Sequence, residues 1–537
     1  MNWGKAMNFI GLGLLGVCFF ISLGRVVTRT KQMADPDHVK IRFAHWQLEG
    51  SLREAFDAIV RDYEKLHPGV QVEQMAIPEK IGKNWARTQL VGGTAPDIIQ
   101  LGSGMGTNDE ILARYFTPLG GEVDQPNPYN AGTDLAGVPW RETFIDGLSS
   151  TTNYSAALLD YFGVPNSMFT FRMYYNRDLW KAVTGDAPTP ENFEDFVEIC
   201  RRTSEYRLPG GERLLPIAGS KYNAPYVMNA LFESQTQKLR LSLDSFHNLA
   251  PAGPSLALSY LDHKWSWDTP GVQSGLELMA RAGKHMQAGF LSLGRDDALF
   301  YFAQQRALMI STGSWDASSL RVQVPFDMGV FRIPLPSPDD PKYGEFVQGR
   351  TSEAGAETST SFGITKGSQH PEVALDFLHF LTSKNSNAKF SKLSGWLPSV
   401  VGVPLGKDIA PFEPITEGYT TGFAPDLAVG ANTSRLFNNN LYELVGPNGS
   451  VSQFSSRMKA GYKDALLADL RLSYRNQTRN AAAKDLTIGT HQMIERSGGA
   501  DAGAAAERVS QHMEAQSQQE AGIYYMNYKL RQPALRP

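Results

Sequence analysis

Cysteine is nearly absent from this chain, since Cys18 and Cys200 are the only two among 537 residues. Two cysteines are too few for a disulfide framework or a cysteine zinc cluster. The ten histidines never fall into the HxH or HExxH spacing of metal sites. The sequence also lacks the GxSxG turn of serine hydrolases and the GxxxxGK[ST] loop that holds phosphates. We therefore expect no metal site, no cofactor and no catalytic residues.

No charge of one sign dominates. The chain has 51 Lys and Arg against 55 Asp and Glu, which gives a net charge of −4. A nucleic-acid-binding protein needs a basic surface, so DNA and RNA are not expected partners. A hydrophobic content of 42% is that of a folded globular protein. At about 150 residues per domain, the length allows two to four domains.

A long hydrophobic run occurs only at the N-terminus. Residues 6–24 carry no charge and are almost wholly apolar, and Lys5 precedes them. This length lies between the apolar core of a signal peptide and a membrane span. No small-residue cleavage site follows, and the bulky Val17 before Cys18 is unlike a bacterial lipobox. We expect residues 1–34 to be a signal peptide or an N-terminal membrane anchor, with lipidation at Cys18 as the weaker alternative.

Strands and helices alternate through the rest of the chain. Residues 39–46 alternate like a strand, and residues 51–66 have apolar side chains at helical spacing. Strand-like segments follow at residues 70–73 and 96–101. Alternation at this spacing predicts βαβ units and a mostly parallel sheet. Further strands are expected at residues 169–175, 307–311, 328–331 and 362–364, and the last hundred residues are expected to be helical.

Several motifs between residues 39 and 405 occur in an order typical of one family. They are IRFAHW (41–46), YEKLHPGV (63–70), GGTAPD (92–97), FGVP (162–165), YYNRDL (174–179), QRALM (305–309), GSW (313–315), IPLP (333–336), FGIT (362–365), HPEVA (370–374) and GWLP (395–398). Together they resemble the extracellular solute-binding proteins of bacterial ABC transporters. The resemblance is to the carbohydrate-binding group related to maltose-binding protein.

The resemblance implies an α/β fold of two lobes, the type II periplasmic-binding-protein fold, with a ligand cleft between them. Lobe 1 is expected at residues 36–165 plus 355–405, and lobe 2 at residues 166–354. Residues 406–537 match nothing in detail and are expected to form a mainly helical region that packs on the lobes. The family also implies export to the periplasm or cell surface, here with the N-terminal segment as a tether to the cytoplasmic membrane. The implied partners are ABC permease subunits, and the chain is expected to be a monomer.

Aromatic residues make up 11% of the chain, and several of the nine tryptophans have Gly, Ser or His neighbours. A flat ring can stack on the C–H face of a sugar, while polar groups bind the hydroxyls. The expected ligand-binding residues are Trp46, Asp97, Arg172, Tyr175, Trp315, Glu357 and Trp396. Core packing is the alternative for each tryptophan, and bracing of its own loop is the alternative for Asp97. Weaker candidates are His45, Trp265 and Trp267, whereas Trp85, Trp180 and Cys200 are expected to be packing residues.

The function that follows is capture of a sugar or oligosaccharide by lobe closure, for delivery to an ABC-type importer. One alternative is a membrane-anchored sensor or scaffold with the same fold. Another is a secreted carbohydrate-active enzyme, which needs two carboxylates on opposite sides of its cleft. The acid pairs Asp296–Asp297 and Asp339–Asp340 are adjacent in sequence and so point to different sides. We therefore do not expect an enzyme.

Overall fold

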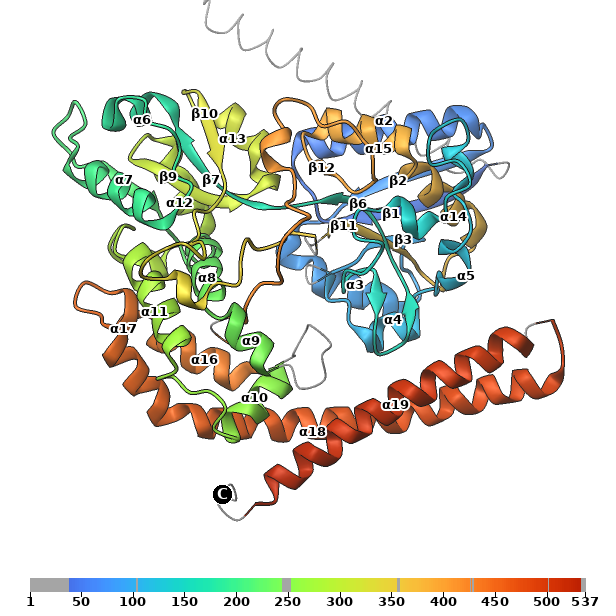
Figure 1. Ribbon diagram of the computed structural model, residues 1–537. Coiled ribbons are helices and arrows are strands. Elements are labelled where there is room, and N and C mark those ends of the chain that lie inside the picture. The colour runs from blue at the N-terminus through green and yellow to red at the C-terminus, as the bar shows by residue number, and fades with distance from the viewer. Residues whose placement is uncertain are drawn as a thin grey trace, which may run out of the picture. The chain divides into compact units, whose positions relative to one another are not determined.

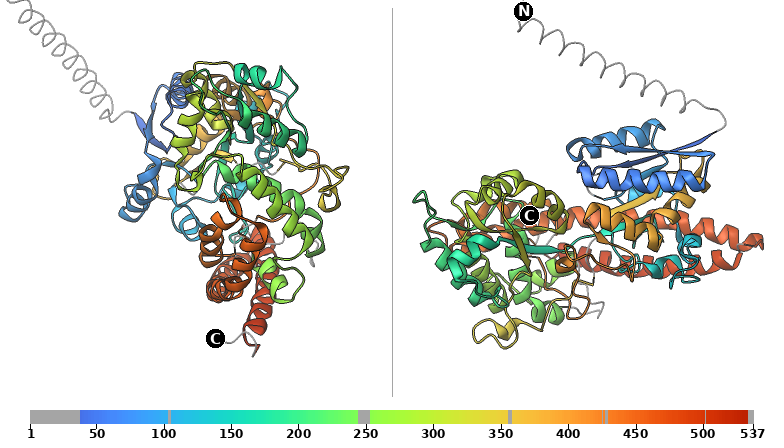
Figure 2. Two further views of the ribbon diagram at one scale, coloured as in Figure 1. Left: turned by 90° about the vertical axis from the view of Figure 1, so that its left-hand side faces the viewer. Right: turned by 90° about the horizontal axis from the view of Figure 1, so that it is seen from above.

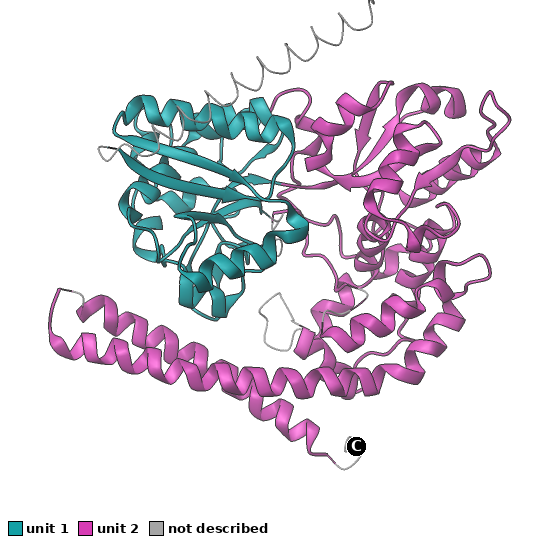
Figure 3. Ribbon diagram, turned by 180° about the vertical axis from the view of Figure 1, so that it is seen from behind, with its two compact units in different colours: residues 1–168, 357–404 teal, residues 169–356, 405–537 magenta. Residues whose placement is uncertain are grey.

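The computed structural model describes residues 38–102, 105–243, 253–354, 358–424, 426, 429–500 and 502–532. Residues 1–34 with Cys18, and the candidate Glu357, lie outside the described residues. The chain divides into two compact α/β units (Figure 3). Unit 1 comprises residues 1–168 and 357–404, and unit 2 comprises residues 169–356 and 405–537. No helix in the described ranges is long and apolar enough to cross a membrane.

Unit 1 is built on a six-stranded sheet in the order β12-β6-β11-β3-β1-β2 (Figure 1). Its strands are β1 (Val39–His45), β2 (Val70–Ala76), β3 (Ile98–Gln100), β6 (Val164–Met168), β11 (Thr358–Ile364) and β12 (Leu397–Pro398), with a separate hairpin of β4 (Tyr154–Ser155) and β5 (Asp160–Tyr161). Its helices are α2 (Gly50–Leu66), α3 (Glu79–Gly92), α4 (Asp109–Tyr115), α5 (Gly120–Val123), α14 (Pro371–Leu381) and α15 (Lys384–Ser394), with 3-10 turns η2 (Pro128–Asn130) and η3 (Trp140–Thr143).

Unit 2 is built on a four-stranded sheet in the order β10-β7-β9-β8. These strands are β7 (Phe171–Asn176), β8 (Leu215–Ala218), β9 (Ala307–Gly313) and β10 (Met328–Phe331). Helices of the sheet-bearing part are α6 (Arg177–Thr184), α7 (Phe193–Glu205), α8 (Ala224–Gln235), α9 (Gln237–Leu243), α10 (Gly253–Leu261), α11 (Pro270–Gly283), α12 (Arg295–Ala303) and α13 (Ala317–Gln323). Four 3-10 turns also occur, η4 (Phe290–Ser292), η5 (Ser314–Asp316), η6 (Gly344–Phe346) and η7 (Ala410–Phe412).

Both large sheets are mixed rather than mostly parallel, which corrects the prediction. In unit 1, β1 is parallel to β2 and β3, but β11 is antiparallel to both β3 and β6. In unit 2, β8 and β9 are parallel, whereas β7 is antiparallel to β9 and β10. The βαβ units were predicted from local alternation. The antiparallel strands come from distant parts of the chain, and their direction is set by tertiary pairing.

The C-terminal residues form α16 (Ala431–Asn440), α17 (Tyr442–Val445), α18 (Val451–Ser497) and α19 (Ala502–Leu530). The first part of α18 packs into the core of unit 2 through residues such as Phe454, Tyr462 and Leu470. Helices α18 and α19 then lie side by side as a long hairpin (Figures 1 and 2). Residues 406–537, the C-terminal region that we expected to pack on the lobes, are thus part of unit 2.

Local periodicity predicted the buried faces well where a helix is amphipathic. Helix α2 buries the apolar residues that the pattern selects, including Phe56 and Ile59. Trp180 and Cys200 are buried, as expected. Trp265 and Trp267 are also buried and pack edge-on against each other in the core of unit 2, so we do not retain them as ligand residues.

Candidate functional site

Four partly buried aromatic residues meet at one edge of the sheet in unit 2. This aromatic patch consists of Phe169, Phe171, Tyr226 and Trp315. Phe171 begins β7 and lies opposite Gly313, which ends β9. Tyr226 lies in the first turn of α8, which follows the carboxyl end of the parallel strand β8. Ligands of open α/β sheets collect at the carboxyl ends of parallel strands, and the patch occupies that position.

The rings form a continuous apolar surface. Phe171 and Tyr226 are stacked, with centroids 4.2 Å apart and planes inclined by 22°. Trp315 stands edge-on to its neighbours, with centroids 4.8 Å from Phe169, 5.6 Å from Phe171 and 6.3 Å from Tyr226. Each of the four side chains stays partly exposed, although rings of this size usually become buried when a core can take them. The patch therefore offers flat ring surface to a ligand.

A glycine makes room for the Trp315 ring. A Cβ atom at Gly313 would come within 2.3 Å of the indole, a distance that real Cβ atoms do not reach. Any other residue at position 313 would push the ring out of place. The Gly-Ser-Trp motif thus has a steric reason, because the indole folds back over the strand end that precedes it.

Hydrogen bonds hold the two aromatic segments against each other. The backbone N–H of Ser314 donates to the carbonyl of Thr170 at 2.9 Å, and the backbone N–H of Thr170 donates to the Ser314 hydroxyl at 3.3 Å. Asp316, next to Trp315, is buried and accepts a hydrogen bond from the Thr312 hydroxyl at 2.5 Å. It also forms an ion pair with Arg295. Burial raises the pKa of Asp316, and the Arg295 guanidinium opposes that rise.

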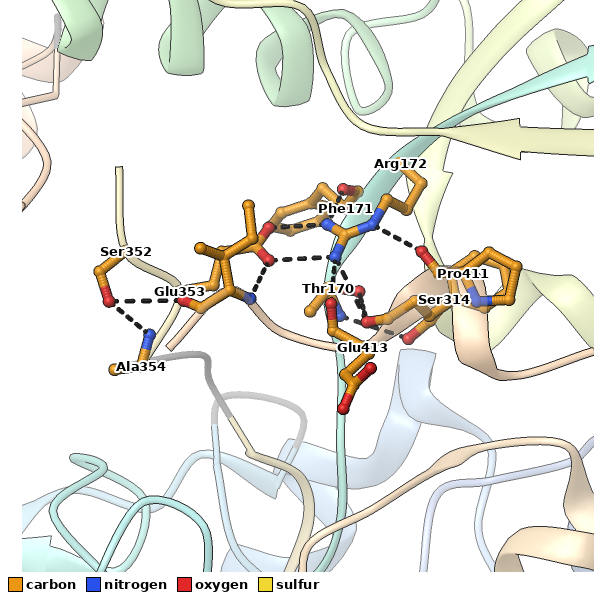
Figure 4. A network of polar contacts seen from close by, with 11 residues as sticks. Thr170, Phe171, Arg172, Ser314, Ser352, Glu353, Ala354, Pro411 and Glu413 are labelled. Carbon is orange, nitrogen blue, oxygen red and sulfur yellow. Dashed lines mark hydrogen bonds and ion pairs between the residues drawn. The ribbon is translucent and has the colours of Figure 1, made fainter. Parts of the chain in front are cut away.

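Arg172, next to Phe171 of the patch, anchors the start of β7 (Figure 4). Its guanidinium is almost fully buried and forms a two-pronged ion pair with Glu353, with N–O distances of 2.7 and 3.0 Å. The same group donates to the carbonyls of Phe171, Pro411, Phe412 and Glu413. The donors of Arg172 are used within the protein, so we revise its predicted role. It is a positioning residue for β7 rather than a ligand contact.

Unit 1 has a smaller candidate surface at Trp46. This side chain follows β1 at the carboxyl end of the parallel strands and is partly buried. Its backbone N–H donates to the Gln100 side chain at 3.2 Å. The indole lies beside Gly102, where a Cβ atom would be 3.3 Å from the ring. Trp46 therefore remains a ligand candidate, with a partly exposed ring at the correct sheet edge.

The other described candidates have structural contacts. The Asp97 carboxylate accepts from the Arg42 backbone N–H at 2.7 Å and from the Ser368 hydroxyl at 2.6 Å, which braces its loop. Asp97 also precedes β3, at the opposite end of the strand from the edge that holds Trp46. Tyr175 is buried in the unit 2 core between Trp180 and Phe331. We no longer propose Asp97 or Tyr175 as ligand residues.

Trp396 and His45 are buried as well. Trp396 is 3% exposed, and its indole N–H has no hydrogen-bond partner among the described residues. His45 is fully buried and its Nε2 lies 2.9 Å from the Gln74 side-chain oxygen. Burial lowers the pKa of His45 to about 4, so the imidazole is neutral in the folded protein. Neither side chain is available to a solute.

The arrangement of the patch suits the binding of a ligand. Within the part of the chain that the structure describes, no three His, Cys, Asp or Glu residues are placed to hold a metal ion. The aromatic patch offers an apolar surface of partly exposed rings. Such a surface can stack on a ring-shaped ligand with an apolar face.

Residues 58–412 match the family model of the bacterial extracellular solute-binding proteins. The chain belongs to this family. Its members are named for binding a solute outside the cell, so the family resemblance read from the motifs is confirmed. The family match ends before the α18–α19 hairpin begins.

Named relatives and solved structures agree with this membership. A multiple sugar-binding protein of Streptococcus mutans is 21% identical over 426 residues, covering 78% of this chain and 87% of the relative. The GacH receptor of Streptomyces glaucescens has a TM-score of 0.55 at 13% identity, covering 80% of this chain and 98% of that one. A chitin oligosaccharide binding protein has a TM-score of 0.51 at 20% identity, covering 79% and 99%. These similarities confirm the two-unit α/β fold of solute-binding proteins.

Sequence reasoning selected Trp315 but missed the rest of the patch. Phe169 and Phe171 stand within the predicted strand FTFRMYY, where every second residue is also apolar. The alternation of apolar residues therefore could not distinguish side chains that face the core from side chains that are partly exposed at the end of the strand. Tyr226 follows Asn223-Ala224-Pro225, a helix-start pattern that places it in a first turn beside the strand ends. That position in the sequence could have identified Tyr226 as a neighbour of the strand ends.

Proposed function

We propose that this protein captures a sugar or short oligosaccharide outside the cytoplasm and delivers it to an ABC-type importer. The observation that carries the proposal is the aromatic patch of Phe169, Phe171, Tyr226 and Trp315. Sugars have apolar C–H faces that stack on aromatic rings, and their hydroxyls bind neighbouring polar groups. The near-neutral charge of the chain suits an uncharged ligand, which needs no electrostatic steering.

The printed names of several relatives support the same ligand class. They include a multiple sugar-binding protein, a chitin oligosaccharide binding protein and a maltodextrin-binding domain bound to maltotriose. The GacH receptor was solved in complex with acarbose. We also propose Trp46 as a sugar contact of unit 1 in its own right, since its partly exposed ring lies at the carboxyl ends of the parallel strands of that unit. We also propose that residues 1–34 tether the protein to the cytoplasmic membrane, where it meets the permease subunits.

Calorimetric titration of the full chain in detergent tests the ligand class. The panel contains maltotriose, a chitin oligosaccharide, a xylan oligosaccharide and raffinose, with a peptide mixture and a polyamine as contrasts. We expect a saturable heat with at least one sugar and none with the contrasts. Binding of the peptides or the polyamine without any sugar would contradict the proposal. Shortening of an oligosaccharide during incubation would instead favour a hydrolase.

A further inference from the structure

The α18–α19 hairpin carries a surface that the sugar site does not use. Beyond Tyr474, no described residue of α18 belongs to the core cluster of unit 2. From there the helix is supported by α19, through contacts such as Gln516 to the Ala481 carbonyl at 3.0 Å. The stacked rings of His491 and His512 add to this support, with centroids 5.6 Å apart. In Figure 3 this part of the hairpin extends well past the other elements of unit 2.

Apolar side chains lie on the exposed side of α18 from Leu472 onward. Leu472 is 47% exposed, Leu486 is 78% exposed and Met493 is 75% exposed. The residues of α18 buried against α19 are Ala481 and Ile488. At 100° per residue, Leu472, Leu486 and Met493 fall on the opposite side of the helix from these two. A two-helix hairpin buries one side of each helix, so this apolar side has no cover within the described hairpin.

The remaining residues of that side complete a stripe with a regular spacing. We define the α18 stripe as Leu472, Arg475, Arg479, Ala482, Ala483, Leu486, Thr490 and Met493, all of which are exposed. Leu472, Arg479, Leu486 and Met493 are seven residues apart, which is the spacing of a helix seam that faces another helix. Ala482 and Ala483, at the middle of the stripe, allow a second helix to approach closely.

The order of the residues along the stripe lets two copies of the stripe fit together when the two helices run antiparallel. An antiparallel pair that crosses at Ala482 and Ala483 places Leu472 opposite Met493 of the second copy. It also places Arg479 opposite Leu486, so that the arginine stem covers an apolar side chain while its charge stays in water. A parallel pair in register would instead set Arg475 on Arg475 and Arg479 on Arg479, and like charges repel. Both arrangements are two-fold symmetric, as most homodimers are, so the charges decide between them.

We propose that the α18 stripe binds the same stripe of a second copy of this chain, antiparallel, to form a homodimer. This replaces the monomer that the family resemblance implies, and it does not depend on the sugar ligand. The contact runs along about 30 Å of helix, which is at the small end for a protein interface. The dimer is therefore expected to form at micromolar rather than nanomolar concentrations.

Sedimentation equilibrium of the full chain in density-matched detergent tests the proposal. We expect a reversible dimer in which Leu486→Glu with Met493→Glu raises the dissociation constant at least about a hundredfold. Val322→Glu is the matched control, because Val322 is 87% exposed on α13, and it should leave the constant unchanged. Circular dichroism should show equal helix content in all variants. A monomeric parent, or a dimer that survives the double substitution, would overturn the proposal.

Disulfide crosslinking checks the register, with Cys18 replaced by Ser throughout. Ala483→Cys should crosslink with itself, because it lies at the two-fold axis. Leu472→Cys and Met493→Cys should each stay uncrosslinked alone and should crosslink when mixed. Self-crosslinking of Leu472→Cys would contradict the antiparallel register. A monomeric chain whose stripe binds anionic lipid vesicles would assign this surface to a membrane and overturn the proposal.

Discussion

Replacing Trp315 by Ala tests the central claim that the aromatic patch binds the ligand. A sugar stacked on one side of the indole covers about 80 Å² of apolar ring, which at roughly 25 cal/mol per Å² is worth about 2 kcal/mol. Loss of that contact should raise the dissociation constant about 30-fold. Trp315→Phe keeps a smaller ring and should retain part of the affinity. Isothermal titration with the sugar found in the panel measures both values.

The same substitution should have a modest effect on the unliganded protein. The Trp315 ring is partly exposed and touches its three aromatic neighbours edge-on, so its removal should cost clearly less free energy of unfolding than the removal of a fully buried indole. Trp180 is the matched control, because it is 2% exposed and its indole N–H donates to the Ala187 carbonyl at 2.8 Å. Trp180→Ala should lower the free energy of unfolding by about 3–5 kcal/mol.

Two results would refute this reasoning. If Trp315→Ala binds the sugar within a few-fold of the parent, the patch is not the stacking surface. If Trp315→Ala lowers the free energy of unfolding of the unliganded protein as much as Trp180→Ala does, the indole is a packing residue. Thermal unfolding of both variants, with and without sugar, separates these cases.

Four further outcomes are expected. Gly313→Ala should raise the sugar dissociation constant about tenfold in calorimetry, since a Cβ atom there displaces the Trp315 ring. Arg172→Met should lower the free energy of unfolding by about 3 kcal/mol in urea titrations, because it leaves the Glu353 carboxylate without its ion pair. Trp46→Ala should weaken sugar binding without a large change in melting temperature, because its ring is partly exposed. Burial lowers the pKa of His379 to about 4, so the unfolded chain binds a proton more readily than the folded chain. The free energy of unfolding should therefore decrease as the pH is lowered from 6.5 to 4. His379→Phe should reduce that pH dependence and leave the share due to His45, whose pKa burial lowers in the same way, as measured by urea unfolding at each pH.

The helices and strands were largely predictable because their patterns are local. The strand predicted at residues 328–331 is β10, and the helix predicted at residues 51–66 is α2. Strand direction was less predictable, since β11 pairs antiparallel with β3 over a separation of more than 250 residues. Periodicity within one segment does not say which distant segment will lie beside it.

The candidate site was predictable only in part, for a related reason. Asp97, Tyr175 and Trp396 lie in family-like motifs, but a motif does not state which way its side chains point. Arg172 is a strand residue with a charged group, and its burial became clear only from the carbonyls of residues 411–413 that receive it. Those acceptors lie some 240 residues away along the chain.

The aromatic patch depends on register more than on any single motif. Phe171 reaches Trp315 because β7 and β9 pair antiparallel with Phe171 opposite Gly313. A shift of this pairing by one residue would turn the alternate side chains of β7 to the other side of the sheet and remove Phe171 from the patch. Gly313 is therefore informative in two ways, because it pairs with the aromatic residue of one strand and makes room for the indole of the next turn. In this chain the glycine that ends β9 two residues before Trp315 therefore accompanies a ring folded back on the sheet edge.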